Sequence, residues 1–495
     1  MHCWWLSAIA AHTHRHHSGR SNIRFLLQDH NQIDALIFGM KPARYPINTN
    51  VTLSGAIMNT KSLASALRIY FRGTFSKVIN KVRPGILPFF LLLNRVRASQ
   101  GWVLVLGGAH CRMVVEDLAS AGYKVFLLDA TPERNNWKFA SGTQVIDVYD
   151  LANISDIVKI ARRLGCNAVL QQSDDFLIPS FAAVNNQLDT NARFSDVAVA
   201  ASTNKEVMRR RLAAAGMSVP WWSIVENDDD LDDLPLPAII KPRYGQGSSG
   251  VAYVETLDAA KAARAFIQRE LDQDSCVYEE FLPDRQFDIE GIIQDGTAHV
   301  HLVTEESYAD DLPNFNRPSW YLHAPRAPSD LESEILRETH AALAACDFRS
   351  GAFHLELKFK DGIAYTIDTA NRLGADFFRF TKLVSGIDTV HAYLQLLTGQ
   401  PLDLEVLPRT PGQQILRFYN HTDRPNHSEI QTLARSLAKS RGISLTERGE
   451  ILELTGEEKR LREFLERVYQ GIPPQRPATL KSIRKQSAAG LQVVV

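Results

Sequence analysis

The sequence predicts an α/β protein that begins with a parallel sheet and continues with antiparallel sheets. Apolar, strand-like segments alternate with amphipathic helical segments between residues 102 and 173, which is the pattern of β/α units on a parallel sheet. Two runs of alternating apolar and polar residues flank a Lys-Asp-Gly turn between residues 351 and 369, as in a β-hairpin. A short apolar strand also leads into a glycine-rich loop at residues 243–251.

The composition is that of a large globular protein with small-molecule partners. Its 495 residues suffice for three or four domains, since a domain typically contains ~100–200 residues. A formal net charge of −1 gives no electrostatic reason to expect nucleic acid as a partner. Residues 86–93 are apolar but far shorter than the ~20 residues that a membrane-spanning helix needs.

The cysteines indicate a reducing compartment, and we expect a cytoplasmic protein. They are odd in number, widely scattered and form no Cys-x-x-Cys pair, so no disulfide framework is expected. The five positions are Cys3, Cys111, Cys166, Cys276 and Cys346.

Residues 1–100 are expected to be a poorly ordered or partly helical basic extension, because they lack the strand and helix periodicity of a compact enzyme. Four histidines between residues 12 and 17 could collect a transition metal, although no scaffold fixes their geometry. Residues 61–83 form a basic amphipathic helix that could lie on an anionic membrane surface. The alternatives are a helix docked on the enzyme, or sequence upstream of a start at Met58.

The β/α units follow in order along the chain. Strands are expected at residues 102–106, 124–129 and 168–173, with helices at 113–121 and 154–164. Gly107-Gly-Ala-His-Cys-Arg does not match Gly-x-Gly-x-x-Gly, so a dinucleotide site is not favoured.

A helix is predicted to begin near residue 203, with Asn204 as its cap and Gly216 beyond its end. Residues 226–233 are strongly acidic and are interpreted as a solvated linker. Residues 304–327 are polar and aromatic, and we expect a substrate-side loop there.

The glycine-rich loop is a candidate phosphate site. Residues 238–242 form an apolar strand in which Lys241 supplies a positive charge. Glycines permit positive φ and serines add hydroxyl donors, so the loop amides could close over phosphate oxygens. The spacing is not that of a P-loop, and a mobile hairpin turn is the alternative. The expected phosphate-facing residues are Gly245, Gly247, Ser248, Ser249 and Gly250.

Residues 277–282 form an extended segment that could bind an adenine ring. Free backbone amides beside Phe281 and Leu282 could hydrogen-bond the adenine edge while these side chains pack on its face. The alternative is a sheet strand on which Glu279 and Glu280 are solvated.

The hairpin is a candidate metal site. A three-residue loop at 360–362 would pair Phe359 with Ile363 and place His354 opposite Asp368. Glu356 then shares a sheet face with both, and two carboxylates there repel unless a cation lies between them. Oxygen ligands suit Mg²⁺, or Mn²⁺ in its place, whereas a merely polar outer face is the alternative.

In this order, the strand lysine, glycine loop, extended segment and carboxylate pair resemble the ATP-grasp superfamily of ATP-dependent ligases over residues 101–400. The resemblance implies an amino-terminal parallel-sheet (pre-ATP-grasp) domain, a two-part ATP-binding module and a small α+β carboxy-terminal appendage. The expected boundaries are 1–100 for the extension, 101–200 for the pre-ATP-grasp domain and 201–400 for the ATP-binding module, whose lid is expected at about 222–282. The carboxy-terminal appendage is expected at 401–472 and a disordered tail at 473–495.

The resemblance also implies roles for individual residues. Lys205, Lys241 and the loop would hold the triphosphate, the segment Glu279–Leu282 would hold adenine and Gln286 the ribose. Glu356 and Asp368 would bind Mg²⁺, and Arg372 would meet the phosphate or acyl phosphate. The family's metal-ligand asparagine should fall at position 370, which is alanine, while Asn371 should point to the other face of its strand.

The expected function is therefore an ATP-dependent carboxylate–amine ligase, or a carboxylate–thiol ligase, working through an acyl phosphate. A non-catalytic nucleotide-binding scaffold is the alternative, and the shifted asparagine favours it. A biotin-type carboxylase ranks lower because no Met-Lys-Met signature is present. The sequence does not decide whether the protein forms a homodimer or whether residues 61–83 contact a membrane surface.

Overall fold

The computed structural model describes residues 94, 98 and 100–469, with gaps at 108–110, 131–137, 189, 309–317, 403, 405–412, 423, 425 and 440–442. The chain divides into two compact units, residues 1–86 and 87–495, and only the second contains described residues. The predictions for the histidine tract, the basic helix and the carboxy-terminal tail lie outside the described residues. No described helix is long and apolar enough to cross a membrane.

The first sheet is parallel, as predicted, with the strand order β3-β2-β1-β4. Its interior strands are near-continuous buried apolar runs, because helices cover a parallel sheet on both faces. Helix α7 has the predicted bounds and ends at Gly165, which adopts a left-handed conformation. The elements are β1 (Trp102–Leu106), α5 (Arg112–Ser120), β2 (Lys124–Asp129), β3 (Gly142–Val145), η3 (Leu151–Asn153), α7 (Ile154–Leu164), β4 (Val169–Leu170), η4 (Asp175–Leu177) and α8 (Ile178–Leu188).

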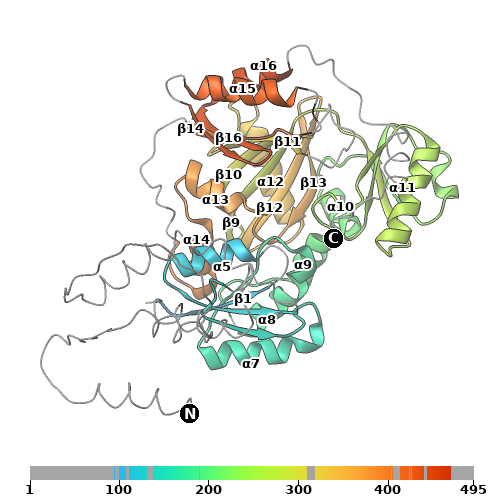
Figure 1. Cartoon of the computed structure of the whole chain (residues 1–495). Helices are drawn as coiled ribbons and strands as arrows, with labels where there is room; N and C mark the ends of the chain where they lie inside the picture. Colours follow the sequence, from blue (N-terminus) through green and yellow to red (C-terminus); the bar gives the residue numbers. More distant parts are fainter. Residues whose placement is uncertain are drawn as a thin grey trace, which may run out of the picture. The chain divides into compact units, whose positions relative to one another are not determined.

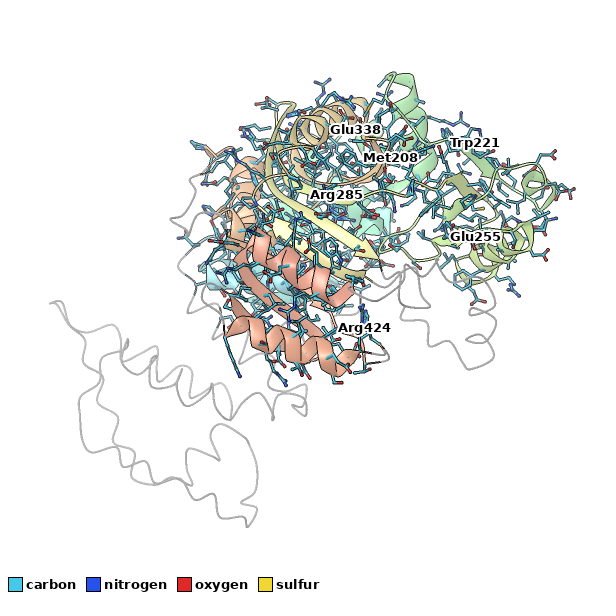
Figure 2. The ribbon with its side chains drawn as sticks, turned by 90° about the horizontal axis from the view of Figure 1, so that it is seen from above. Met208, Trp221, Glu255, Arg285, Glu338 and Arg424 are labelled. Atoms are coloured by element: carbon cyan, nitrogen blue, oxygen red, sulfur yellow. The ribbon has the colours of Figure 1, made fainter. Side chains whose placement is uncertain are left out.

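A small sheet occupies residues 222–280 and is antiparallel, with the order β5-β8-β6-β7. One helix, α11, packs on it around a core that includes Ile240, Ile267 and Tyr278. Trp221 and Glu255 mark this part of the molecule in Figure 2. Its elements are β5 (Trp222–Val225), η5 (Asp229–Leu231), β6 (Ala238–Pro242), β7 (Ala252–Val254), α11 (Leu257–Glu270) and β8 (Cys276–Glu280).

The central sheet has eight antiparallel strands in the order β13-β12-β9-β10-β11-β14-β16-β15 (Figure 1). Met208 of α10 and helix α12, which carries Glu338, pack on the core face of β9 and β12 (Figure 2). The strands are β9 (Gln286–Gln294), β10 (Thr297–Tyr308), β11 (Pro318–Ala324), β12 (Gly351–Lys360), β13 (Ile363–Ala370), β14 (Gln413–Tyr419), β15 (Ser444–Arg448) and β16 (Ile451–Glu457). The helices are α9 (Asp196–Thr203), α10 (Lys205–Ala214), α12 (Glu332–Ala345), α13 (Phe377–Val384), α14 (Thr389–Thr398), α15 (His427–Ala438) and α16 (Glu458–Tyr469).

Two expectations about this sheet need correction. Residues 304–327 are not one long loop, because β10 runs to Tyr308 and β11 starts at Pro318. The segment after residue 412 has its own apolar core but contributes β14, β15 and β16 to the central sheet. The carboxy-terminal appendage therefore shares a sheet with the larger module.

The predicted register of the hairpin was wrong. The loop has two residues, Asp361 and Gly362, both with positive φ, and it pairs Lys360 with Ile363. Asp-Gly suits this tight turn because both positions require positive φ. The ladder then shifts by one residue at Ile367, which forms a β-bulge.

Candidate functional site

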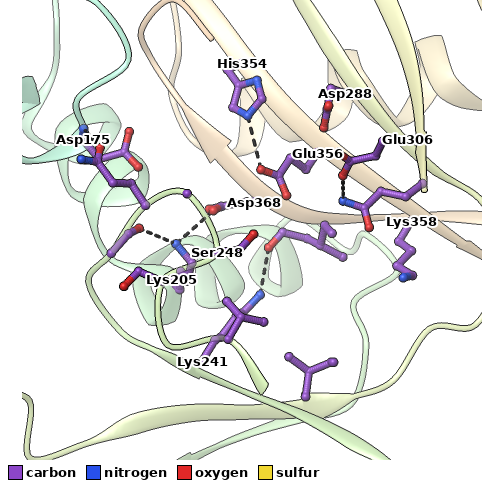
Figure 3. A pocket seen from close by; sticks show the side chains of 18 of the residues that line it. Asp175, Lys205, Lys241, Ser248, Asp288, Glu306, His354, Glu356, Lys358 and Asp368 are labelled. Carbon is purple, nitrogen blue, oxygen red and sulfur yellow. Dashed lines mark hydrogen bonds and ion pairs between the residues drawn. The ribbon is translucent and has the colours of Figure 1, made fainter. Parts of the chain in front are cut away.

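One cavity of about 320 Å³ lies between the small sheet and the central sheet, and it is bordered by residues that follow β4 (Figure 3). Every predicted site residue lines it except Gly250. The cavity thus brings together residues that are up to 204 positions apart in the sequence, from Ser173 to Phe377.

The bulge arranges carboxylates across three neighbouring strands. Glu356 of β12 lies directly opposite Asp288 of β9 and also directly opposite Asp368 of β13. We call these three residues the carboxylate row. The adjacent cross-strand row is Glu290, His354 and Ala370, so His354 does not face Asp368 as predicted. Glu356 and Asp368 nevertheless share the sheet face that lines the cavity.

Lys205 is the first residue of α10, which Asn204 caps by accepting hydrogen bonds from the amides of Glu206 and Val207, as predicted. The Lys205 side chain is buried, and its Nζ lies 3.0 Å from Asp368 Oδ2 and donates to the Gly245 carbonyl at 3.0 Å. Burial opposes its charge, but the carboxylates of Asp368, Asp175 and Glu356 together raise the pKa of Lys205. Lys205 therefore links the glycine loop to the carboxylate row.

Lys241 on β6 belongs to a buried charge network that the sequence did not reveal. Its Nζ lies 2.5 Å from Glu279 Oε1 and donates to the Ile367 carbonyl at 3.1 Å. Arg209 from α10 donates to Glu279 Oε2 at 2.7 and 3.0 Å and to the carbonyls of Thr366 and Ile367. Burial, together with Arg209, lowers the pKa of Lys241 despite the Glu279 carboxylate.

This network corrects the interpretation of Glu279. Its carboxylate is neither solvated nor free for a ligand, because Arg209 and Lys241 hold it. Burial would raise the pKa of Glu279, but these two cations lower it. Its neighbour Glu280, at the end of β8, is half-buried and pairs with Lys360 at the end of β12.

The rest of the predicted adenine segment presents apolar groups to the cavity. Phe281 meets Tyr253 edge-on with ring centroids 4.7 Å apart, and Lys358 Nζ lies 5.2 Å from the centre of the Phe281 ring. Leu282 is buried beside it. The amide of Gln286, the predicted ribose ligand, donates to Glu306 in a short hydrogen bond.

The glycine loop has positive φ at Gly247, Ser248 and Gly250 but not at Gly245. A Cβ at Gly245 would instead lie 3.2 Å from Pro242 Cγ, so close packing favours glycine there. The loop reaches the residues that follow β4, because the backbone amide of Asp175 donates to Gln246 Oε1 at 2.7 Å.

Arg372, which follows β13, is buried and also lines the cavity. Its Nε donates to Asp175 Oδ1 at 2.5 Å. Burial opposes its charge, but Asp175 raises the pKa of Arg372. Asn371 points to the opposite side, as predicted, and donates to the carbonyls of Ser350 and Ala352.

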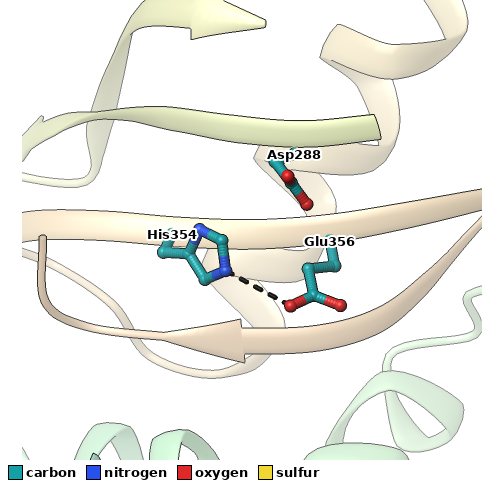
Figure 4. A group of neighbouring side chains, drawn as sticks. All are labelled: Asp288, His354 and Glu356. Carbon is teal, nitrogen blue, oxygen red and sulfur yellow. Dashed lines mark hydrogen bonds and ion pairs between the residues drawn. The ribbon is translucent and has the colours of Figure 1, made fainter. Parts of the chain in front are cut away.

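Sequence reasoning missed Asp288, Glu290 and Glu306 and gave His354 no role. The ligand atoms of Asp288, His354 and Glu356 lie within 4.8 Å of one another (Figure 4). Burial and the carboxylates of Glu306 and Glu356 raise the pKa of Asp288 well above its usual range. The available signal was period-two alternation, since polar residues occupy every second position from 286 to 290 between buried apolar ones.

Comparison with known proteins identifies the fold. Residues 234–378 match the ATP-grasp domain family. Carnosine synthase 1 from Gallus gallus is 25% identical over 192 residues, which are 36% of this chain and 20% of that protein. The human protein of the same name is 23% identical over 210 residues, which are 39% of this chain and 25% of that protein. The chain thus aligns with only a fifth to a quarter of these relatives.

Solved structures agree. An L-amino acid ligase from Bacillus licheniformis superposes with a TM-score of 0.59 and 17% identity, over 75% of this chain and 97% of that one. A phosphoribosylglycinamide synthetase from Anaerococcus prevotii superposes with a TM-score of 0.54 and 14% identity, over 75% of this chain and 98% of that one. The fold is therefore an ATP-grasp fold with an amino-terminal parallel-sheet domain.

Proposed function

We propose that this ATP-grasp protein is an ATP- and Mg²⁺-dependent ligase that activates a small carboxylate as an acyl phosphate and joins it to an amine. One observation carries the proposal. A single cavity is lined by two lysines beside a glycine loop, a pair of facing carboxylates and a buried arginine. Phosphoryl transfer from a nucleotide to an acid needs these groups in one enclosure.

The small-sheet side of the cavity suits the nucleotide. Lys205 and Lys241 supply two positive charges, and the loop amides between Gly245 and Ser249 supply donors for phosphate oxygens. The Asp368 contact and the Gly245 carbonyl now occupy the Lys205 ammonium, so phosphate oxygens would compete for it. Phe281 and Leu282 form an apolar edge for the adenine ring.

The residues present fit Mg²⁺. Glu356 and Asp368 face each other across neighbouring strands and line the same cavity, and oxygen ligands are those that Mg²⁺ prefers. The ion would neutralise charge on the phosphate oxygens. Burial opposes ionisation of Asp368, but Lys205 and Lys241 lower its pKa, which keeps a carboxylate available at neutral pH.

The reaction needs no side-chain nucleophile. A carboxylate oxygen of the substrate attacks the γ-phosphorus of ATP, and ADP leaves. The amine then attacks the acyl carbon, the amide forms and inorganic phosphate leaves with one oxygen of the original carboxylate. Arg372 would stabilise negative charge on the transferring phosphoryl group, held in place by Asp175.

The substrates are inferred to be amino acids or similar small molecules. Two of the similar proteins are named carnosine synthase and L-amino acid ligase. The formal net charge of −1 favours no nucleic-acid partner.

The test is ADP release from the full chain with ATP and Mg²⁺, screened over amino acids and small carboxylates with and without an amine. An acid that supports ADP release, labelled with ¹⁸O in its carboxylate, should transfer one ¹⁸O to the released phosphate. ATP binding without ADP release for any acid would instead support the non-catalytic scaffold. ADP release without ¹⁸O transfer would exclude the acyl phosphate.

A further inference from the structure

We propose that Asp288, His354 and Glu356 form a second divalent-cation site, distinct from the Glu356–Asp368 pair and sharing Glu356 with it. The site would take a first-row transition ion such as Mn²⁺ in preference to Mg²⁺. It rests on the proposed function only in treating Glu356 and Asp368 as the nucleotide-associated Mg²⁺ pair.

The geometry supplies three ligand atoms from two rigid strands. Asp288 on β9 and Glu356 on β12 are direct cross-strand partners, and His354 lies two residues from Glu356 on the same face. One nitrogen and two carboxylate oxygens lie within 4.8 Å of one another, and all three residues line the cavity (Figure 4). Ligands on neighbouring strands are held more precisely than ligands on loops.

Asp288 is the observation that points to a cation. It is only 2% exposed, and no hydrogen bond or ion pair joins its side chain to any described residue. Its carboxyl group points toward Glu356 and His354 (Figure 4). A buried carboxyl group without a partner is costly. Glu356 lies directly opposite it and Glu306 lines the same cavity, so negative charge gathers there, while the neighbouring His354 offsets part of it. A cation would satisfy it.

His354 is oriented as a metal ligand. Its Nδ1 lies 2.5 Å from Glu290 Oε1, which leaves Nε2 facing Glu356 at 3.3 Å. A histidine that binds a metal commonly gives its other ring nitrogen to a carboxylate or carbonyl, which fixes the ring. Glu290 is itself held by the amide of Gly374, where a Cβ would lie only 2.1 Å from its carboxylate oxygen. On binding, the ion replaces the proton on Nε2.

The adjacent cross-strand row, Glu290, His354 and Ala370, brings the imidazole nitrogen of His354 to the site. Position 370, where the resemblance predicts an asparagine ligand, is alanine, and His354 is its direct cross-strand partner. Residues that face each other across strands are neighbours on the same face. The imidazole therefore stands next to the place where an amide oxygen is missing. An imidazole ligand favours transition ions over Mg²⁺.

The experiment measures Mn²⁺ binding to the full chain without nucleotide, by electron paramagnetic resonance with pulsed detection of ¹⁴N coupling. His354→Gln and Asp288→Asn remove ligands, Glu290→Gln removes only the support of the ring, and His340→Gln, at an exposed position of α12, is the control. Histidines 12–17 contribute the same background to every form, so differences between forms report the site.

We expect His354→Gln to lose one equivalent of Mn²⁺ or bind it at least about tenfold more weakly, and to lose ¹⁴N coupling relative to the unmodified chain. Asp288→Asn should weaken the site while ¹⁴N coupling stays, and Glu290→Gln should weaken it about 10–100-fold, as for residues that support a ligand. His340→Gln should change neither quantity.

Equal Mn²⁺ stoichiometry and equal ¹⁴N coupling in all forms would overturn the proposal, because the ion would then sit elsewhere. Mn²⁺ binding that occurs only with nucleotide and without site-specific ¹⁴N coupling would overturn it too. If His354→Gln unfolds, Asp288→Asn decides instead: unchanged Mn²⁺ affinity in that variant would overturn the proposal. Absence of ADP release would refute the proposed function and leave this result untouched.

Discussion

Replacing Glu279 by glutamine tests whether the buried network positions Lys241. Glu279 Oε1 lies 2.5 Å from Lys241 Nζ, and Oε2 lies 2.7 Å from Arg209 Nη2. All three side chains are buried, with Arg209 fully so. The amide would leave two buried cations facing each other without a counterion.

The expected loss is large. Removing one partner of a buried ion pair typically costs ~3–5 kcal/mol, against a total stability of ~5–15 kcal/mol for a domain. Arg209 cannot lose its proton, so Lys241 is the group that must become neutral. The double variant Glu279→Gln with Arg209→Met removes one of the two cations. It should therefore be more stable than Glu279→Gln alone, with coupling of ~0.5–3 kcal/mol between the changes.

The assay combines urea unfolding with the pH dependence of ATP binding. Burial and Arg209 already lower the pKa of Lys241, and Glu279 opposes them. Without Glu279 the Lys241 pKa should fall further, so ATP affinity in Glu279→Gln should decline with rising pH earlier than in the unmodified chain. The double variant should shift this decline back. Stability within ~0.5 kcal/mol of the unmodified chain, as for a surface substitution, together with an unchanged pH profile, would refute the reasoning.

Three further predictions follow from the same geometry. Lys205→Met should weaken ATP binding by about tenfold or more, which corresponds to ~1.4 kcal/mol of binding free energy. Titration calorimetry measures this affinity, and an unchanged value would contradict the prediction. Gln246→Ala removes the contact between the glycine loop and Asp175, so amides 245–250 should exchange hydrogen faster without ATP; unaltered exchange would contradict this. Burial raises the pKa of Glu305, but Arg285 and Arg462 lower it below its ordinary value in the folded protein. The ionised Glu305 therefore stabilises the fold at pH values above its pKa in the unfolded chain, and this stabilisation is lost as the pH falls through its pKa in the folded protein. Glu305→Gln should therefore lose less stability than the unmodified chain on acidification, which chemical denaturation at pH 7 and pH 4 can check.

The sequence predicts the elements whose signals are local. Asn204 caps α10 as predicted, and α7 has the predicted bounds 154–164, because helix ends depend on a few neighbouring residues. The cavity face of β12 was also predictable, since alternation places Glu356 and His354 on one side. ATP-grasp architecture followed from the order of these motifs.

The parts that could not be predicted depend on distant residues. Glu279 was assigned to the adenine-binding segment, with a solvated strand as the alternative, because its partner Arg209 lies 70 residues away on another element. Asp288 alternates with buried apolar residues on β9, but only the packing of β12 beside it gives its carboxyl group neighbours. The hairpin register was also ambiguous, since Lys-Asp-Gly fits a loop of two or three residues.

The bulge at Ile367 shows why that register matters for the site. Thr366 faces α12, where its amide and hydroxyl donate to buried Glu338, whereas Asp368 faces the cavity and meets Lys205. In a regular strand these two positions would share a face, so one of the two contacts would be lost. The carbonyl of Ile367 accepts hydrogen bonds from Lys241 and Arg209. Lys241, which bonds the extra position, also places its charge in the cavity. The core contact to α12 and the direction of the Asp368 side chain thus depend on one backbone irregularity.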